Sequence, residues 1–330
     1  MKKFLKDCAV YILVVACILI VLISIQPAMV RTLPNDFSRH RVIIEALHDN
    51  GHQPDIIFFG NSLSMFGIDA KTIGKNLPGS PVVYNLSSVG QSIFEGAYFV
   101  SSVPEKTKQV FQCVDYSIFT ESKNGLQDAK AMSMILNGYH IDSSTRMILN
   151  KTHPYFDQNK WLVAYEARGN LRSSVHNYLR KYLDYEKFDT NFHDRYFPHI
   201  YLDERHPRYP NISDNKNYDS LPISDTLVSL ANRIKASLEK RNIQYHIILM
   251  PVNPEIYPLN DSLCAVYLND LKSRLPGIDI IDLSRALKPE FFYDAIHANK
   301  KGAESLSVMI ANRIMDEAEK SGDTSNGEGK

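Results

Sequence analysis

Residues 54–69 read PDIIFFGNSLSMFGID and place one serine, Ser62, directly after a short apolar run. The unbroken run Ile56–Phe59 is typical of a strand covered on both faces, and therefore of the centre of a parallel sheet. Gly60 ends the run and a helix can start at Ser64, so Ser62 would lie at the sheet edge where open α/β folds bind ligands. Backbone N–H groups there could hold an oxyanion, although a serine that only caps the helix fits the same pattern.

Apolar and helical segments alternate over residues 54–319, where we predict one α/β domain. Strands are predicted at 56–59, 82–85, 110–119, 245–250 and 278–282. Helices are predicted at 65–76, 93–103, 224–241, 263–274 and 300–319. Because helices separate the strands, the pattern predicts a doubly wound, mostly parallel sheet.

Residues 1–30 have the pattern of a transmembrane signal anchor. Lysines near the N-terminus precede the run Cys8–Ile25, which contains no charge, Gly or Pro and is long enough to span a bilayer. A cleaved signal peptide would need a shorter run with a small-residue cleavage site, and a lipoprotein site at Cys17 would need polar residues after it. The lysines predict a cytoplasmic N-terminus, a single pass through the inner (cytoplasmic) membrane and an extracytoplasmic domain.

Two polar segments flank the predicted domain. Residues 31–53 are predicted to form a stalk that includes a short helix, and residues 320–330 a disordered tail.

The formal net charge is zero and no basic run occurs, which argues against a nucleic-acid partner. Two of the four cysteines lie in the apolar run, so only Cys113 and Cys264 could pair, and the chain is not a disulfide scaffold.

Residues 123–221, between the third and fourth predicted strands, form an insertion far longer than an ordinary crossover connection. The insertion is rich in tyrosine and holds the one tryptophan, Trp161. Its rings could stack on sugar faces, or they could pack a small helical core. The histidine-rich stretch HDRYFPHIYLDERH at 193–206 lacks a recognised ligand spacing, so we predict no metal site and no cofactor. We expect the insertion to cover the Ser62 edge as a lid, the alternative being a separate module that faces a partner protein.

Near the C-terminus the chain reads FFYDAIHANKKGAESL, with Asp294 and His297 just before the last predicted helix. An activated serine needs a base within hydrogen-bond reach and a carboxylate that orients this base. A loop after the last strand of a parallel sheet would emerge at the same edge as Ser62. Aspartate and histidine also cap helices, so this pair alone leaves both interpretations open.

Together these blocks resemble the SGNH (GDSL-like) hydrolase superfamily. The resemblance implies a flavodoxin-like sheet in which the turn Gly60-Asn61-Ser62 supplies the nucleophile Ser62. It implies further that His297 is the base and Asp294 the carboxylate that orients it. The backbone N–H groups of Ser62 and Gly90 would form the oxyanion hole.

One block departs from the family pattern. The family usually supplies an asparagine side chain to the oxyanion hole from a G-x-N-D block, and this chain reads Thr120–Asn124 there. Asn124 is in the right chain order for that role. Asn61 and Asn253 are expected to contact the substrate. The likeness covers about residues 54–122 and 224–315 and leaves the insertion out.

Within the superfamily, the anchor, the Gly-Asn-Ser opening and the large insertion are similar to DltD-like and alginate-acetylation-like proteins of bacterial envelopes. This similarity implies a serine esterase or O-acyltransferase that acts on an acylated glycan or teichoic acid, beside a multi-span membrane-bound O-acyltransferase. The missing G-x-N-D block favours an alternative, a non-catalytic SGNH-fold scaffold in an envelope polysaccharide acylation or export complex.

Overall fold

The computed structural model describes residues 2–32, 36–51, 53–116, 118–119, 222–257 and 261–323. The chain forms two compact units, one of residues 1–42 and 126–192 and the other of residues 43–125 and 193–330. Within the first unit, only residues 2–32 and 36–42 are described. The insertion predicted at 123–221, including Asn124, lies outside the described residues, as do residues 324–330.

The N-terminal helix α1 (Lys2–Thr32) carries the predicted apolar segment. Among the described residues, its part Lys2–Leu22 is the one stretch long and apolar enough to cross a membrane, with 21 residues and a mean hydropathy of 2.5. At about 1.5 Å per residue, such a stretch matches the roughly 30 Å hydrocarbon core of a bilayer. The prediction of a long apolar helix is confirmed. That this helix anchors the chain in a membrane, and in which direction it crosses, stays a prediction.

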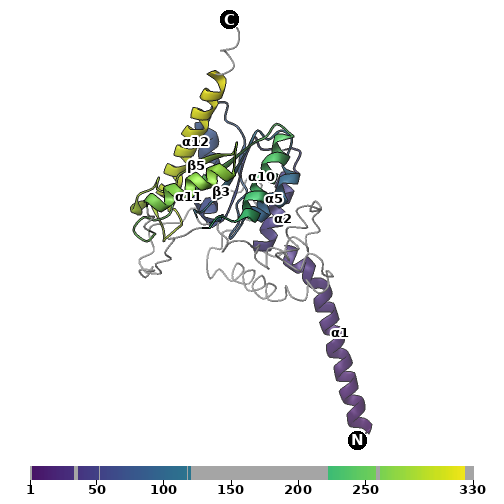
Figure 1. The fold of residues 1–330 in the computed structure, drawn as a ribbon. Coiled ribbons are helices and arrows are strands. Elements are labelled where there is room, and N and C mark those ends of the chain that lie inside the picture. Colours follow the sequence, from purple (N-terminus) through teal and green to yellow (C-terminus); the bar gives the residue numbers. More distant parts are fainter. Residues whose placement is uncertain are drawn as a thin grey trace. The chain divides into compact units, whose positions relative to one another are not determined.

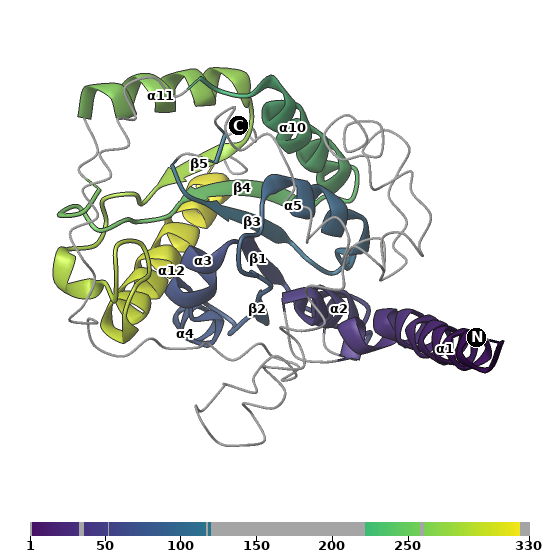
Figure 2. The same ribbon diagram turned by 90° about the horizontal axis from the view of Figure 1, so that it is seen from below.

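A five-stranded sheet forms the centre of the second unit (Figure 2). Its strands are β1 (Ile56–Gly60), β2 (Val83–Asn85), β3 (Gln109–Val114), β4 (Gln244–Leu249) and β5 (Asp279–Asp282). They lie in the order β2-β1-β3-β4-β5, and every neighbouring pair is parallel. In sheets of this order, ligands bind beyond the carboxyl ends of the strands, where the strand order reverses. Here that point lies between β1 and β3.

Helices cover both faces of this sheet (Figures 1 and 2). On one face α12 (Lys300–Asp323) packs against α3 (Ser62–Gly67) and α4 (Ala70–Asn76). On the other face α10 (Asp225–Glu239) packs against α5 (Ile93–Phe99) and strand β4. The predicted doubly wound α/β fold is therefore confirmed. The described residues also form the helices α2 (Asp36–Leu47) and α11 (Asp261–Arg274) and the short 3-10 turns η1 (Val100–Ser102) and η5 (Pro289–Phe291).

Several predicted element boundaries are wrong. The helix predicted at 65–76 is two helices, because the Asp69 carboxylate accepts a hydrogen bond from the Lys71 N–H and starts α4 afresh. The strand predicted to reach residue 119 ends at Val114, and a turn follows in which the Ile118 N–H bonds the Asp115 carbonyl. Helix α12 continues to Asp323, into the segment 320–330 that was predicted to be disordered.

A row of rings crosses the sheet on the face that α12 covers. Phe58 on β1 is in register with Phe111 on β3, and Phe111 is in register with His246 on β4. The Phe58 and Phe111 rings stack with centroids 4.9 Å apart, and the Phe111 and His246 rings stack at 4.7 Å. Ile310 and Ile314 of α12 are buried in the same core cluster as the two phenylalanines. This layer holds α12, and the loop before it, against the sheet.

Candidate active site

Ser62 begins helix α3 directly beyond the carboxyl end of β1. Asn61 is the N-cap, and its side-chain Oδ1 accepts a hydrogen bond from the Leu63 N–H at 3.0 Å. The turn must start at a glycine, because a Cβ on Gly60 would lie 2.5 Å from the Cys113 carbonyl oxygen on β3. The Ser62 side chain stays partly exposed, whereas the neighbouring Ser64 is fully buried. Of these two serines, only Ser62 is accessible to a substrate.

His297 and Asp294 lie beside this serine. The His297 Nε2 atom is 2.9 Å from the Ser62 Oγ, and the His297 Nδ1 atom is 2.7 Å from Asp294 Oδ2. The second oxygen of Asp294 accepts hydrogen bonds from the backbone N–H groups of Ile296, at 2.9 Å, and His297, at 2.7 Å. The three side chains predicted from two distant parts of the sequence thus form one hydrogen-bonded chain.

The surroundings of Asp294 set the direction of these hydrogen bonds. Burial opposes ionisation, but hydrogen bonds from the His297 ring and from two backbone N–H groups lower the pKa of Asp294 below its ordinary value. An ionised carboxylate only accepts, so the His297 Nδ1 carries the hydrogen. In the neutral ring Nε2 is then the acceptor for the Ser62 hydroxyl. This is the arrangement that a general base needs.

The loop that carries Asp294 and His297 is held by several backbone contacts. The Tyr293 N–H bonds the His297 carbonyl at 2.8 Å, which closes the turn around Asp294. The Asn299 side chain accepts from the Gly302 N–H at 3.0 Å and caps the start of α12. The Asn253 N–H, in the loop after β4, bonds the Ala295 carbonyl at 3.0 Å. The loop that carries Asp294 and His297 is therefore bonded both to the start of α12 and to the loop after β4.

The loop after β2 is tied to the end of β1. The Ser88 N–H bonds the Gly60 carbonyl at 2.9 Å, and the Gly60 N–H donates to the buried Gln91 side chain. Gly90 lies in this loop with φ of +64°, a conformation that favours glycine. The predicted oxyanion donor is thus on a loop anchored next to Ser62, and its role stays a prediction.

The other predicted site residues are placed as follows. The Nδ2 of Asn61 donates to Asp115 Oδ2 at 3.3 Å, so both ends of this amide are engaged within the protein. Asn253 is 1% exposed, and its Oδ1 accepts from the Glu255 N–H at 3.0 Å. Their expected contacts with substrate stay predictions. Asn124 lies outside the described residues.

Sequence reasoning missed residues that support the site. The Phe66 ring meets the His297 ring edge-on, with centroids 5.2 Å apart, and restricts the tilt of the imidazole. The sequence could have predicted this contact, because Phe66 lies four residues after Ser62 and residues at that spacing share one face of a helix. Gln91 and Asp115 had no comparable signal, since they reach Gly60 and Asn61 through contacts between distant parts of the chain.

No family model matches the chain, and no curated protein matches it either. Among solved structures, one described as "a putative platelet activating factor from Streptococcus pneumonia" covers 84% of this chain and 91% of its own length. The sequence identity is 9% and the TM-score is 0.39. A likeness of that degree says nothing about activity.

Proposed function

We propose that this chain is a membrane-tethered serine esterase or O-acyltransferase that acts on acyl esters of a cell-envelope glycan or teichoic acid. The observation that carries the proposal is the hydrogen-bonded chain from Ser62 through His297 to Asp294. A serine hydroxyl, an imidazole and a carboxylate in this order are the parts of a nucleophile that a general base activates. The resemblance of the Gly-Asn-Ser turn and of the Asp294–His297 spacing to SGNH hydrolases supports the same reading.

The reaction would proceed in two acyl-transfer steps. The Ser62 Oγ attacks the ester carbonyl carbon while the His297 Nε2 takes the hydroxyl proton. Backbone N–H groups of Ser62 and Gly90 would hold the oxyanion, and loss of one such donor typically costs about 3 kcal/mol of transition-state stabilisation. The ester C–O bond then breaks, and His297 gives its proton to the leaving alcohol. Water or a sugar hydroxyl, deprotonated by His297, then attacks the acyl carbon, and His297 returns that proton to the Ser62 Oγ as the acyl–Oγ bond breaks.

The substrate class rests on the anchor and on the resemblance. A helix long enough to span a bilayer precedes the domain in the chain, so it would tether the site to a membrane. Lysines before this helix favour an extracytoplasmic site, where acylated envelope polymers occur. A multi-span membrane-bound O-acyltransferase is the partner proposed on the same grounds. It would supply the acyl group or take it up.

The experiment is covalent labelling of the purified full-length chain with a fluorophosphonate. An activated serine attacks the phosphorus and expels fluoride, whereas an ordinary hydroxyl does not react. We expect one label per chain, lost in Ser62→Ala and kept in Ser273→Ala, a matched change at an exposed serine of α11. Hydrolysis of a small aryl acetate should follow the same pattern.

Thermal unfolding separates loss of chemistry from loss of fold. The Ser62 side chain is partly exposed, so Ser62→Ala should melt close to the wild-type temperature. Equal labelling of wild type and Ser62→Ala would refute the nucleophile. A folded wild-type chain that takes no label would favour the non-catalytic scaffold instead.

A further inference from the structure

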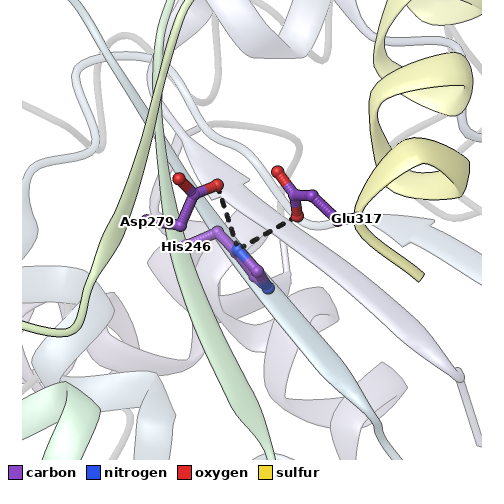
Figure 3. Close-up of side chains that lie close together, drawn as sticks. All are labelled: His246, Asp279 and Glu317. Atoms are coloured by element: carbon purple, nitrogen blue, oxygen red, sulfur yellow. Dashed lines mark ion pairs between the residues drawn. The ribbon is translucent and has the colours of Figure 1, made fainter. Parts of the chain in front are cut away.

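A second cluster of side chains lies at the opposite end of the sheet. His246 is on β4, Asp279 begins β5 and Glu317 lies on the last part of α12 (Figure 3). His246 and Asp279 are in register on neighbouring strands, so their side chains share one face of the sheet. Helix α12 brings Glu317 to that face. Because Asp279 is the first residue of β5, the cluster lies toward the amino ends of the strands, away from the Ser62 edge.

The His246 ring is buried without a hydrogen bond. The residue is 8% exposed, and neither ring nitrogen has a hydrogen-bond partner among the described residues. A buried polar atom without a hydrogen bond is costly, and each case in a folded protein needs an explanation. The ring stacks on Phe111, which fixes its plane, and its Nδ1 points between the two carboxylates (Figure 3). The histidine is therefore aimed at a position between Asp279 and Glu317.

The distances fit a shared ion better than direct hydrogen bonds. The His246 Nδ1 lies 3.6 Å from Asp279 Oδ2 and 3.7 Å from Glu317 Oε2. A hydrogen bond would place these atoms about 2.7–3.2 Å apart. Two ligands that are each about 2.1 Å from a tetrahedral zinc ion lie about 3.4 Å from one another. One ligand atom from each of the three residues lies within 4.8 Å of the other two.

The cluster brings two carboxyl groups to one ring nitrogen. Asp279 and Glu317 each have an oxygen within 3.7 Å of the His246 Nδ1, and the Arg313 guanidinium acts on both carboxyl groups. A divalent cation placed between the carboxyl groups would bind both of them and would accept the His246 nitrogen as a third ligand.

We infer that His246, Asp279 and Glu317 bind one divalent transition-metal cation, best matched by Zn²⁺, which clamps α12 to β4 and β5. One imidazole nitrogen and two carboxylate oxygens are a donor set that zinc accepts, whereas Ca²⁺ and Mg²⁺ prefer oxygen alone. Three protein ligands leave a fourth position for water. The competing reading is a histidine that simply shares charge with two carboxylates, and it predicts that no cation binds.

The test measures zinc binding to the full-length chain in detergent. After treatment with a chelator, the protein is dialysed against Zn²⁺, and bound zinc is counted by mass spectrometry. We expect wild type to hold one equivalent more than Glu317→Gln and Asp279→Asn. The matched control Glu304→Gln changes an exposed carboxylate on the same helix and should keep the full amount. Loss of a direct ligand should weaken zinc binding by at least about 100-fold, since second-shell changes alone reach that range.

Thermal unfolding gives a second readout. Zinc should raise the melting temperature of wild type, Glu304→Gln and Ser62→Ala, and it should do so far less in the two ligand variants. The chain has other histidines that could hold zinc elsewhere. Because all variants keep those histidines, the difference in zinc content between wild type and a ligand variant counts only the zinc bound at this cluster. The half-exposed Asp279 offers a variant that folds even if Glu317→Gln does not. Equal zinc content in wild type and the folded ligand variants would overturn the inference.

Discussion

The His297 Nε2 lies 2.9 Å from the Ser62 Oγ, although the two residues are 235 positions apart in the chain. The contact exists because β1 and the loop before α12 meet at the same edge of the sheet. Ser62 is fixed by the cap of α3, and His297 is fixed by the turn that its own carbonyl closes. A substitution that shifts the α3 cap or the turn around Asp294 should therefore change this distance and the proposed reactivity of Ser62.

Asp294→Asn should lower kcat for a small aryl acetate by about 10³- to 10⁴-fold. The amide can donate to the ring, which would hold His297 in the tautomer that cannot accept the Ser62 proton. Steady-state kinetics on the purified chain would measure the loss, with a thermal melt to show that the variant folds. Turnover near the wild-type rate would show that Asp294 does not orient the base.

Asp294 should also make stability depend on pH. Its pKa is lowered in the folded chain, so its ionised form stabilises the fold above the ordinary value near 4, and this contribution is lost as the pH falls through the folded value. The gap in melting temperature between wild type and Asp294→Asn should be largest at neutral pH and should shrink below about pH 4. Asp316→Asn, at an exposed carboxylate of α12, serves as the control. A gap that stays constant from pH 7 to 3 would contradict the assignment.

Gln91→Ala should destabilise the domain by about 1–3 kcal/mol, because it leaves the buried Gly60 N–H without an acceptor. The same side chain also donates to the Leu86 carbonyl at 3.3 Å. Gln109→Ala is the matched control, since its side chain bonds Gln244 at an exposed position, and it should change stability by less than about 0.5 kcal/mol. Chemical denaturation would measure both. Similar values for the two variants would show that Gln91 does not hold the turn.

Asn61→Asp should destabilise the turn, because it places a second carboxylate where Asn61 now donates to Asp115 at 3.3 Å. The cost should be about 1–3 kcal/mol, as for other buried polar groups that lose a partner. The double variant Asn61→Asp with Asp115→Asn restores a donor and should recover most of the loss. A double-mutant cycle gives the coupling directly. Additive losses in that cycle would mean that the two side chains do not interact.

A reporter fused after residue 330 should show an extracytoplasmic C-terminus, because lysines precede the apolar helix. The protein should also remain with the membrane after a high-salt wash, since an apolar helix and not surface charge would hold it. A reporter that is active only in the cytoplasm would refute this topology.

Local patterns predicted the elements that carry the candidate catalytic side chains. The apolar run before Gly60 predicted β1, and the Asp294–His297 spacing predicted the second half of the site, because both signals lie within a few neighbouring residues. The break between α3 and α4 was missed, although Asp69 before Lys71 carries an N-cap signal.

Contacts between distant segments could not be predicted in the same way. Gln91 reaches Gly60 across 31 positions, and no pattern in one sequence pairs them. His246, Asp279 and Glu317 come from two strands and a helix, so they share no ligand spacing along the chain. Their meeting depends on strand register and on how α12 crosses the sheet, which are properties of the assembled fold.

Helix α12 covers the apolar layer around Phe58 and Phe111, yet it is the last long element of the chain to be synthesised. At about 5–20 residues per second, roughly 10–40 s pass between completion of β3 and the start of α12. During that interval strands β1 and β3 have been synthesised, but the apolar face that α12 will cover is still exposed. An apolar face left open for this long is exposed to aggregation, so folding of the chain should depend on a holding chaperone until α12 is complete.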